Sequence, residues 1–171
     1  LDGARLCNAI VAKKESAQEY GQLFDSISLC LNKGLGCPAG SLLIGNAEFI
    51  RKARRVRKVF GGGMRQAGYL AAAGIYALDH HWDRLAKDHY HADQIRQALQ
   101  EKDFVGNILP VETNILIFEV AGRFTPQSFK QKLEEQGIKV MAISPTQVRM
   151  VTHLEITEDM VERTIEVISG L

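Results

Sequence analysis

Residues 28–36, Ser-Leu-Cys-Leu-Asn-Lys-Gly-Leu-Gly, place a lysine between an apolar strand and a glycine-rich loop. Apolar and β-branched residues alternate over 25–31, which predicts the strand. Glycine and proline are too frequent over 33–40 for a regular element, so a loop is expected there. An amine at such a junction can be partly desolvated, which makes it a nucleophile. The competing interpretation of Lys33 is a solvated loop lysine, because most lysines lie on protein surfaces.

Further elements of the first half are indicated by periodicity. Residues 41–45 predict a short buried strand, and residues 46–59 predict a helix rich in basic side chains. Three glycines at 61–63 interrupt the helical pattern. A small-residue-rich helix, buried on several faces, is expected over 64–78, and an amphipathic helix over 82–101.

The second half has a different order of elements. A strand is followed by a helix, two strands and a closing helix, which indicates a small α+β unit. Thr125 is a good N-cap, Pro126 suits the first helical position, and Gly137 suits the end. The elements are expected at 113–120, 125–136, 138–143, 147–152 and 157–168.

Composition narrows the class of protein. The 171 residues are 46% hydrophobic and 24% charged, as in globular domains, and the net charge of +1 offers no global field for nucleic acid or an anionic membrane. The longest apolar run, residues 69–78, is half the ~20 residues that a membrane span needs. The cysteines, Cys7, Cys30 and Cys37, are odd in number and form no Cys-x-x-Cys pair, so neither a disulfide framework nor a zinc site is predicted. A reducing cytoplasm is the expected location.

Two clusters of side chains could indicate nucleic-acid binding or metal binding. The basic run 51–58 lacks interleaved aromatic residues, so a solvated helix face is favoured over a nucleic-acid surface. His80, His81, His89 and His91, with Asp83, show none of the usual zinc-site spacings and fall on a helix expected to be exposed. A surface location is therefore predicted for the histidines, and no metal site.

The run Asp2-Gly3-Ala4-Arg5 carries a second chemical signal. A carboxylate at the end of a strand can pair with the nitrogen of a pyridine ring and keep it protonated, which makes the ring an electron sink. Ala4 leaves room for a flat ring beside that carboxylate. Asp2 taken alone suits the capping of an amphipathic helix equally well. After glycines 61–63, Arg65 is a candidate to face an anion.

In combination these segments resemble the low-specificity L-threonine aldolases. The resemblance rests on D-G-A-R at 2–5, S-L-C-L-N-K-G-L-G-C-P-A-G-S at 28–41, A-R-R-V-R-K-V-F-G-G-G-M-R-Q-A-G at 53–68 and V-R-M-V-T-H-L at 148–154. It implies the α/β fold of PLP-dependent transferases, fold type I, with pyridoxal 5′-phosphate (PLP) as cofactor. Residues 1–79 would be the later part of the large domain, 80–102 a linking helix, and 103–171 a small C-terminal α+β domain.

The resemblance also implies roles for individual residues. Lys33 matches the lysine that holds the cofactor covalently, and Asp2 matches the partner of the pyridine nitrogen. Arg5 matches an arginine near the PLP 3-oxygen and the substrate carboxylate. Arg149 matches an arginine of the small domain that binds the same carboxylate. Lys58 and Arg65 match basic residues that line the site near the phosphate, contributed to a neighbouring subunit.

The implied reaction is the cleavage of L-threonine or L-allo-threonine, or a related β-hydroxy amino acid, to glycine and an aldehyde. The family forms tetramers built from dimers. The resemblance further implies an N-terminal segment of the same protein, supplying the phosphate loop, a group stacked on the ring and the base for the hydroxyl. Two alternatives stay open: another PLP-dependent lyase on the same scaffold, and a non-catalytic fragment.

Overall fold

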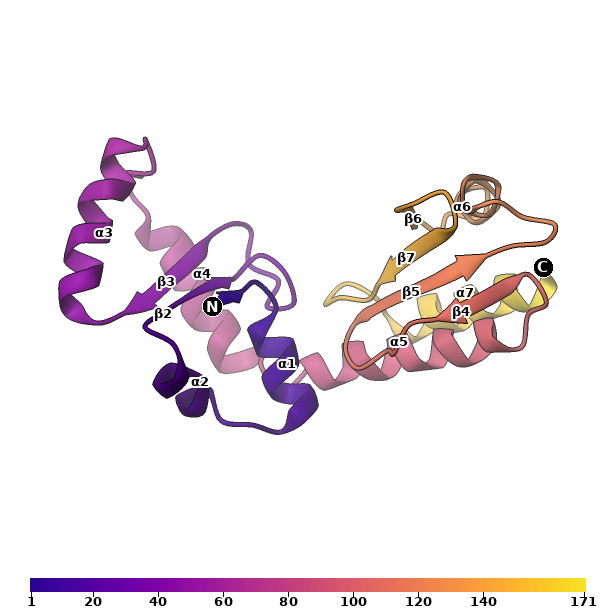
Figure 1. Ribbon diagram of the computed structural model, residues 1–171, viewed down its shortest axis with the longest axis horizontal. Coiled ribbons are helices and arrows are strands. Elements are labelled where there is room, and N and C mark those ends of the chain that lie inside the picture. Colours follow the sequence, from indigo (N-terminus) through magenta and orange to yellow (C-terminus); the bar gives the residue numbers. More distant parts are fainter. The chain divides into compact units, whose positions relative to one another are not determined.

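The computed structural model describes residues 1–171 and divides into two compact units, Leu1–Leu85 and Ala86–Leu171 (Figure 1). Each unit has its own sheet and its own apolar core. No helix in either unit combines the length and the apolar character that crossing a bilayer requires. The division into parts of a large and a small domain stays a prediction.

The first unit is built on a three-stranded sheet of order β1-β2-β3. Strand β1 (Asp2–Gly3) pairs parallel with β2 (Ser26–Cys30), and β2 pairs antiparallel with β3 (Ser41–Gly45). A Cβ atom on Gly3 would lie 2.8 Å from the carbonyl oxygen of Ser28, so the close pairing of β1 with β2 requires glycine at that position.

Four helices accompany this sheet: α1 (Leu6–Lys13), α2 (Ala17–Leu23), α3 (Ala47–Val59) and α4 (Gly68–His80). The helix expected at 46–59 is confirmed, and Asn46 caps it by accepting a hydrogen bond from the Phe49 amide at 2.9 Å. The core of the unit combines buried side chains of α1, β2 and the loop after β2. They include Leu6, Ile10, Ile27, Leu29 and Leu35.

Two expectations about burial in this unit are wrong. The strand at 41–45 was expected to be buried, but Leu42, Leu43 and Ile44 of the edge strand β3 are 40–47% exposed, and no β3 side chain belongs to the core of the unit. The helix expected over 64–78 was expected to be buried on several faces, but α4 leaves Tyr69 84% exposed. Helix α4 also begins later than expected, at Gly68, because Gln66 adopts a left-handed φ of 53° that ends any helical run before it.

The second unit contains a four-stranded sheet of order β4-β5-β7-β6, in which every neighbouring pair is antiparallel. The strands are β4 (Val105–Ile108), β5 (Ile115–Val120), β6 (Met141–Ala142) and β7 (Gln147–Val151). The strand pattern at 113–120 and 147–152 is confirmed. Strand β4 was not predicted, because its Val-Gly-Asn-Ile sequence lacks apolar alternation, and β6 is shorter than the strand expected at 138–143.

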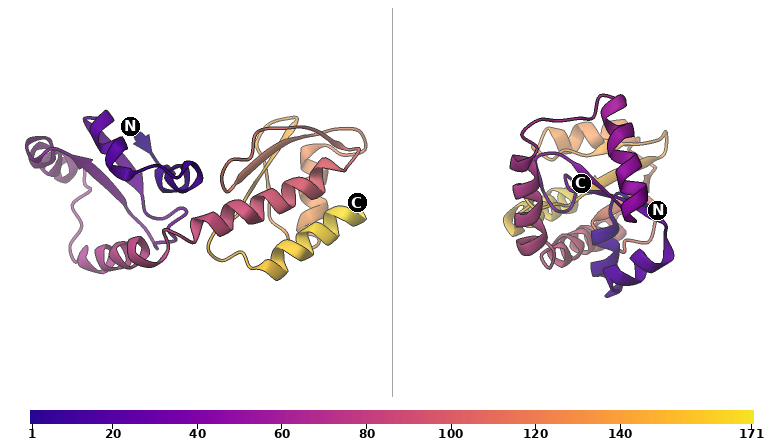
Figure 2. Two further views of the ribbon diagram at one scale, coloured as in Figure 1. Left: turned by 90° about the horizontal axis from the view of Figure 1, so that it is seen from below. Right: turned by 90° about the vertical axis from the view of Figure 1, so that its left-hand side faces the viewer.

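Helices α5 (Leu85–Gln100), α6 (Pro126–Glu134) and α7 (Glu158–Gly170) supply the other half of the core. Figures 1 and 2 show α5 and α7 side by side along the sheet. The expected cap at Thr125 is present, with the Ser128 amide donating to its hydroxyl at 3.2 Å. The expectation of an exposed α5 is wrong: Asp88 and His91 are fully buried, because the helix packs Ala92, Ile95 and Leu99 into the core.

Phe129 should be a main support of the second unit. It is fully buried and its ring centroid lies 5.7–6.0 Å from those of Phe104, Phe118 and Phe124. We expect Phe129→Ala to lower the free energy of unfolding by about 3–5 kcal/mol in urea titrations, through lost contacts and a cavity. Met141, which is 61% exposed, offers the control. Met141→Ala should change the free energy of unfolding by less than ~0.5 kcal/mol. Similar losses in both variants would contradict this account of the core.

Candidate functional site

The first unit brings the Asp2 motif and Lys33 to one edge of its sheet. Asp2 pairs with Ser28 and Gly3 with Leu29, in parallel register. Because parallel strands end at the same edge, the segments that follow β1 and β2 leave the sheet together. Ala4 and Arg5 follow β1 directly, and Lys33 lies in the loop that follows β2. Crevices at the carboxyl ends of parallel strands are the usual ligand sites of α/β sheets.

Backbone hydrogen bonds fix the loop that carries Lys33. The Gly36 amide donates to the Lys33 carbonyl at 2.9 Å, which closes a tight turn over 33–36. Gly36 has a φ of 70°, a left-handed value that favours glycine. The Cys37 amide donates to the Leu31 carbonyl at 3.1 Å, and the Leu31 amide to the Gly40 carbonyl at 3.0 Å. The loop is therefore an ordered structure with its own hydrogen bonds.

Packing fixes the same loop on the inside of the unit. The Leu35 side chain is completely buried, and its carbonyl accepts a hydrogen bond from Nδ1 of His81 at 2.7 Å. Gly34 lies against α1: a Cβ atom there would come within 2.5 Å of Oδ1 of Asn8. Lys33 itself is exposed, so the described residues do not supply the expected partial desolvation of its amine. The side chain thus extends from a loop held on its inner face.

Asp2 is exposed, and its Oδ1 accepts a hydrogen bond from the Ala4 amide at 3.2 Å. Helix α1 begins at Leu6 with Arg5 in the N-cap position, so the carboxylate does not cap that helix. This disfavours the capping interpretation of Asp2. The second carboxylate oxygen, Oδ2, can accept a hydrogen bond from a ligand. Arg5 is half-buried at the start of α1.

Arg149 lies in the middle of β7 in the second unit. Its neighbours Val148 and Met150 are buried against the helices, so by strand alternation Arg149 lies on the other face of the sheet, between Ile117 of β5 and Met141 of β6. Its Nε atom is buried and makes no hydrogen bond within the chain. Buried donors are nearly always paired in folded proteins, so this guanidinium is suited to an anionic acceptor from outside the chain.

Lys58 and Arg65 are not brought to the Lys33 edge. Gly45, the last residue of β3, pairs with Ser26, the first residue of β2, so α3 begins at the opposite edge of the sheet. Figure 1 shows α3 running away from the sheet. Lys58 lies in its last turn and Arg65 in the loop that follows, and both are exposed.

The two buried cysteines of the first unit, Cys7 and Cys37, are not activated. Burial raises the pKa of the Cys7 thiol to about 11 and also raises the pKa of Cys37. Both stay protonated at neutral pH, and a thiol rather than a thiolate is a poor nucleophile. Neither residue therefore competes with Lys33 as the reactive group of this unit.

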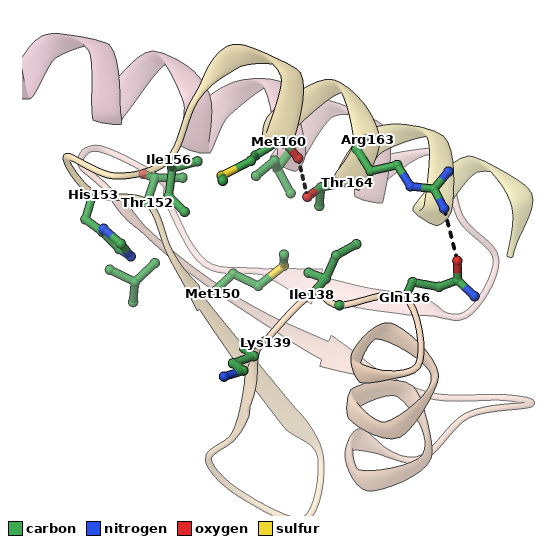
Figure 3. Close-up of a pocket in the computed structure, with 13 residues that line it drawn as sticks. Gln136, Ile138, Lys139, Met150, Thr152, His153, Ile156, Met160, Arg163 and Thr164 are labelled. Carbon is green, nitrogen blue, oxygen red and sulfur yellow. Dashed lines mark hydrogen bonds between the residues drawn. The ribbon is translucent and has the colours of Figure 1, made fainter.

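A cavity of about 390 Å³ lies within the second unit, between α7, β7 and the segment after α6 (Figure 3). Its wall is mainly apolar and includes Met150 and Ile138. Two polar groups at the wall already have partners: Thr164 donates to the Met160 carbonyl at 2.7 Å, and Arg163 to Oε1 of Gln136 at 3.1 Å. No residue proposed above for the site lines this cavity.

Comparison with known proteins shows the family. The sequence model of the beta-eliminating lyases matches residues 1–146. The chain belongs to the beta-eliminating lyase family. It is 39% identical over 168 residues to low-specificity L-threonine aldolase 1 of Arabidopsis thaliana, covering 96% of this chain and 47% of that protein. It is 42% identical over 159 residues to the low specificity L-threonine aldolase of Escherichia coli K12, covering 93% and 46%. The chain thus spans about half the length of these relatives.

Solved structures confirm the fold class. A protein from Exiguobacterium sp. 255-15, assigned to the aromatic amino acid beta-eliminating lyases/threonine aldolases, matches with a TM-score of 0.80 at 24% identity, over 99% of this chain and 51% of that one. Leishmania major threonine aldolase matches with a TM-score of 0.75 at 19% identity, over 99% and 50%. Ornithine delta-aminotransferase of Plasmodium falciparum matches with a TM-score of 0.65 at 15% identity, over 99% and 45%. The chain has the α/β architecture of fold type I.

Sequence reasoning did not identify Asn8 and His81 as contacts of the Lys33 loop. Asn8 is fully buried although it is polar, and His81 was grouped with surface histidines. A buried asparagine three residues after the Asp2-Gly3-Ala4-Arg5 motif gives no periodic signal. Only the three-dimensional structure shows that both residues contact the same turn.

Gly34 tests whether the loop needs its close approach to α1. We expect Gly34→Ala to lower the free energy of unfolding by about 1–3 kcal/mol, because the added methyl group would overlap Asn8 and Leu85. Gly21→Ala in α2 is the matched control: a Cβ atom added there would have no other atom within 4 Å, and alanine favours the helix. Equal effects of the two substitutions in urea titrations would contradict the proposed packing.

Proposed function

We propose that the intact protein is a PLP-dependent aldehyde-lyase that cleaves L-threonine and L-allo-threonine to glycine and acetaldehyde. Membership of the beta-eliminating lyase family and the similarity to curated threonine aldolases support this proposal. The structural observation that supports it is the parallel pairing of Asp2 with Ser28, because the segments after β1 and β2, including the Lys33 loop, then leave the sheet at a common edge.

The residues at this edge fit PLP. The exposed Lys33 amine would hold the cofactor covalently, and the Asp2 carboxylate would accept a hydrogen bond from the protonated pyridine nitrogen. Ala4, between Asp2 and Arg5, is small enough to leave space for the ring. When bound, PLP supplies an electron sink that stabilises the carbanion formed on breaking the Cα–Cβ bond. Asp2 sustains this property by keeping the ring nitrogen protonated.

Binding of the amino acid carboxylate is assigned to arginines. Arg149 offers a half-buried guanidinium whose Nε makes no hydrogen bond within the chain. A planar fork of N–H donors matches a carboxylate bidentately, which fixes the orientation of the substrate as well as its position. Arg5 is proposed to assist near the PLP 3-oxygen. Orientation matters because the bond to be broken must stand perpendicular to the ring.

The active protein is proposed to be a cytoplasmic homotetramer, and its complete site to include an N-terminal segment that precedes this sequence in the intact protein. The coverage of about half of each relative supports the need for further residues. Lys58 and Arg65 are proposed to serve a neighbouring subunit near the phosphate, since they lie away from the Lys33 edge. Exposed apolar side chains, such as Phe60 directly after α3 and Tyr69 in α4 at 84% each, support contacts with further protein.

Replacement of Lys33 is the direct test of the reaction. In the intact protein with PLP we expect acetaldehyde release from both threonine isomers, and Lys33→Ala should lower kcat by at least about a thousandfold, because the covalent anchor is lost. Lys139→Ala removes another exposed lysine, in the second unit, and should leave kcat unchanged. Comparable activity of the Lys33 and Lys139 variants would refute the assignment.

Arg149 should affect the substrate more than the cofactor. We expect Arg149→Gln to raise KM for threonine about ten- to a hundredfold, because a charged hydrogen-bonded pair with the substrate carboxylate is lost. The Kd for PLP should change little. Arg163→Gln, on the exposed side of α7, should alter neither constant. A parallel loss of threonine and PLP binding would mean that Arg149 is structural.

The family description also favours β-elimination as a second candidate reaction. A carbon–oxygen or carbon–sulfur lyase would release pyruvate and ammonia from serine or cysteine instead of an aldehyde from threonine. Assay of pyruvate beside acetaldehyde separates these reactions. Absence of both products and of PLP binding in the intact protein would favour the non-catalytic alternative.

A further inference from the structure

We propose that His81 is a positioning residue for Lys33, acting through the carbonyl of Leu35. The inference rests on the proposed role of Lys33 as the cofactor lysine. It concerns a contact between two segments 46 residues apart in sequence, both within the first unit.

The His81 ring is held in place from its own side. The residue ends α4, and its amide donates to the Ala77 carbonyl at 2.8 Å, which fixes the backbone. The Tyr76 ring meets the His81 ring edge-on, with centroids 5.5 Å apart and an interplanar angle of 85°. Nδ1 of His81 therefore approaches Leu35 from a side chain with a defined direction.

The chemistry of this contact requires a hydrogen on Nδ1. A backbone carbonyl only accepts, so the 2.7 Å bond is formed by an imidazole that carries its proton on Nδ1 or by an imidazolium. Both forms donate in the same direction. The contact therefore depends on an N–H at the δ position of the side chain and not on a positive charge.

The bond acts on the turn that carries Lys33. The turn over 33–36 is closed by the Gly36 amide on the Lys33 carbonyl, and the Leu35 carbonyl lies inside this turn. Fixing that carbonyl fixes the peptide plane between Leu35 and Gly36, which has a left-handed φ of 70°. Without the donor, a carbonyl of a fully buried residue would lose its partner, and the peptide would rotate to regain one.

The loop is thus held from two helices. Asn8 of α1 lies against Gly34, and His81 at the end of α4 donates to the Leu35 carbonyl. Asn8 lies on the helix that directly follows the Asp2 motif, so α1 relates Lys33 to Asp2. The hydrogen bond from His81 is a second contact that fixes the loop backbone. Because the Lys33 side chain is exposed, the direction of its amine depends on this fixed backbone.

The test compares His81→Leu with His81→Asn in the intact protein. The asparagine amide places an N–H at the δ position, whereas leucine has a similar size and no donor. Two readouts are taken: the rate at which added PLP becomes trapped on the Lys33 peptide by borohydride, and kcat and KM for threonine. His80→Leu is the matched control, because the His80 ring bonds to Tyr76 of its own helix and not to the loop.

We expect His81→Leu to lower the trapping rate and kcat about ten- to a hundredfold, the cost of a displaced reacting group, with KM changed by less than about twofold. In His81→Asn the trapping rate and kcat should stay within about threefold of the wild-type values. The control His80→Leu should have the wild-type trapping rate and kcat. If His81→Leu does not fold, the isosteric pair His81→Asn and His81→Asp carries the same comparison.

The positioning role would be overturned by a His81→Leu protein that traps PLP at the wild-type rate. Equal losses in the leucine and asparagine variants, or a loss of thermal stability with normal trapping, would also overturn it. If the wild-type protein itself does not trap PLP on Lys33, the proposed function is wrong, and the positioning role of His81 is wrong with it. The measurement on the wild-type protein therefore distinguishes failure of the proposed function from failure of the His81 role alone.

Discussion

The parallel pairing of β1 with β2 is the constraint on which the proposed site depends. Gly3 makes this pairing possible, because a side chain there would collide with the Ser28 carbonyl. The pairing directs two segments, the one that follows Asp2 and the one that carries Lys33, to the same edge of one sheet. On this basis we propose that Asp2 and Lys33, 31 residues apart in sequence, belong to one cofactor site.

The rigidity of that edge comes from the interior of the unit. Lys33 is exposed, yet the residues after it are packed: Leu35 is fully buried, and Gly34 lies against Asn8. An exposed reactive group on a fixed backbone suits covalent attachment of a cofactor, since the amine can be reached while its origin does not move. The second unit, taken by itself, contains an arginine, Arg149, whose buried Nε makes no hydrogen bond within the chain.

Local patterns predicted several capped helices and the strands with clear alternation, but they missed α2, although Ser16 and Glu19 form a capping box at its start. Asn46, Thr125 and Thr157 mark helix starts that the structure contains, because a capping side chain acts on neighbouring amides and leaves a local signal. Burial was predicted less well. The apolar β3 is an exposed edge strand, and His91 of α5 is fully buried, since both depend on what packs against the element.

The chemical residues were found by type and order, not by distance. Lys33 and Asp2 could be paired only through the family resemblance, and the parallel register of β1 and β2 is consistent with that pairing because it brings their segments to one sheet edge. The contact of His81 was not predicted, because its partner is a backbone carbonyl 46 residues away. Every residue has such a carbonyl, so the residue types give no signal for this contact. Lys58 and Arg65 show the converse: basic residues matching the family that the fold of this unit does not bring to Lys33.

A crystal structure of the intact protein with PLP tests the central claim most directly. The account predicts a covalent bond between Nζ of Lys33 and the cofactor, with an Asp2 carboxylate oxygen at about 3 Å from the pyridine nitrogen. A cofactor attached to another lysine, or a pyridine nitrogen with a different partner, would contradict it.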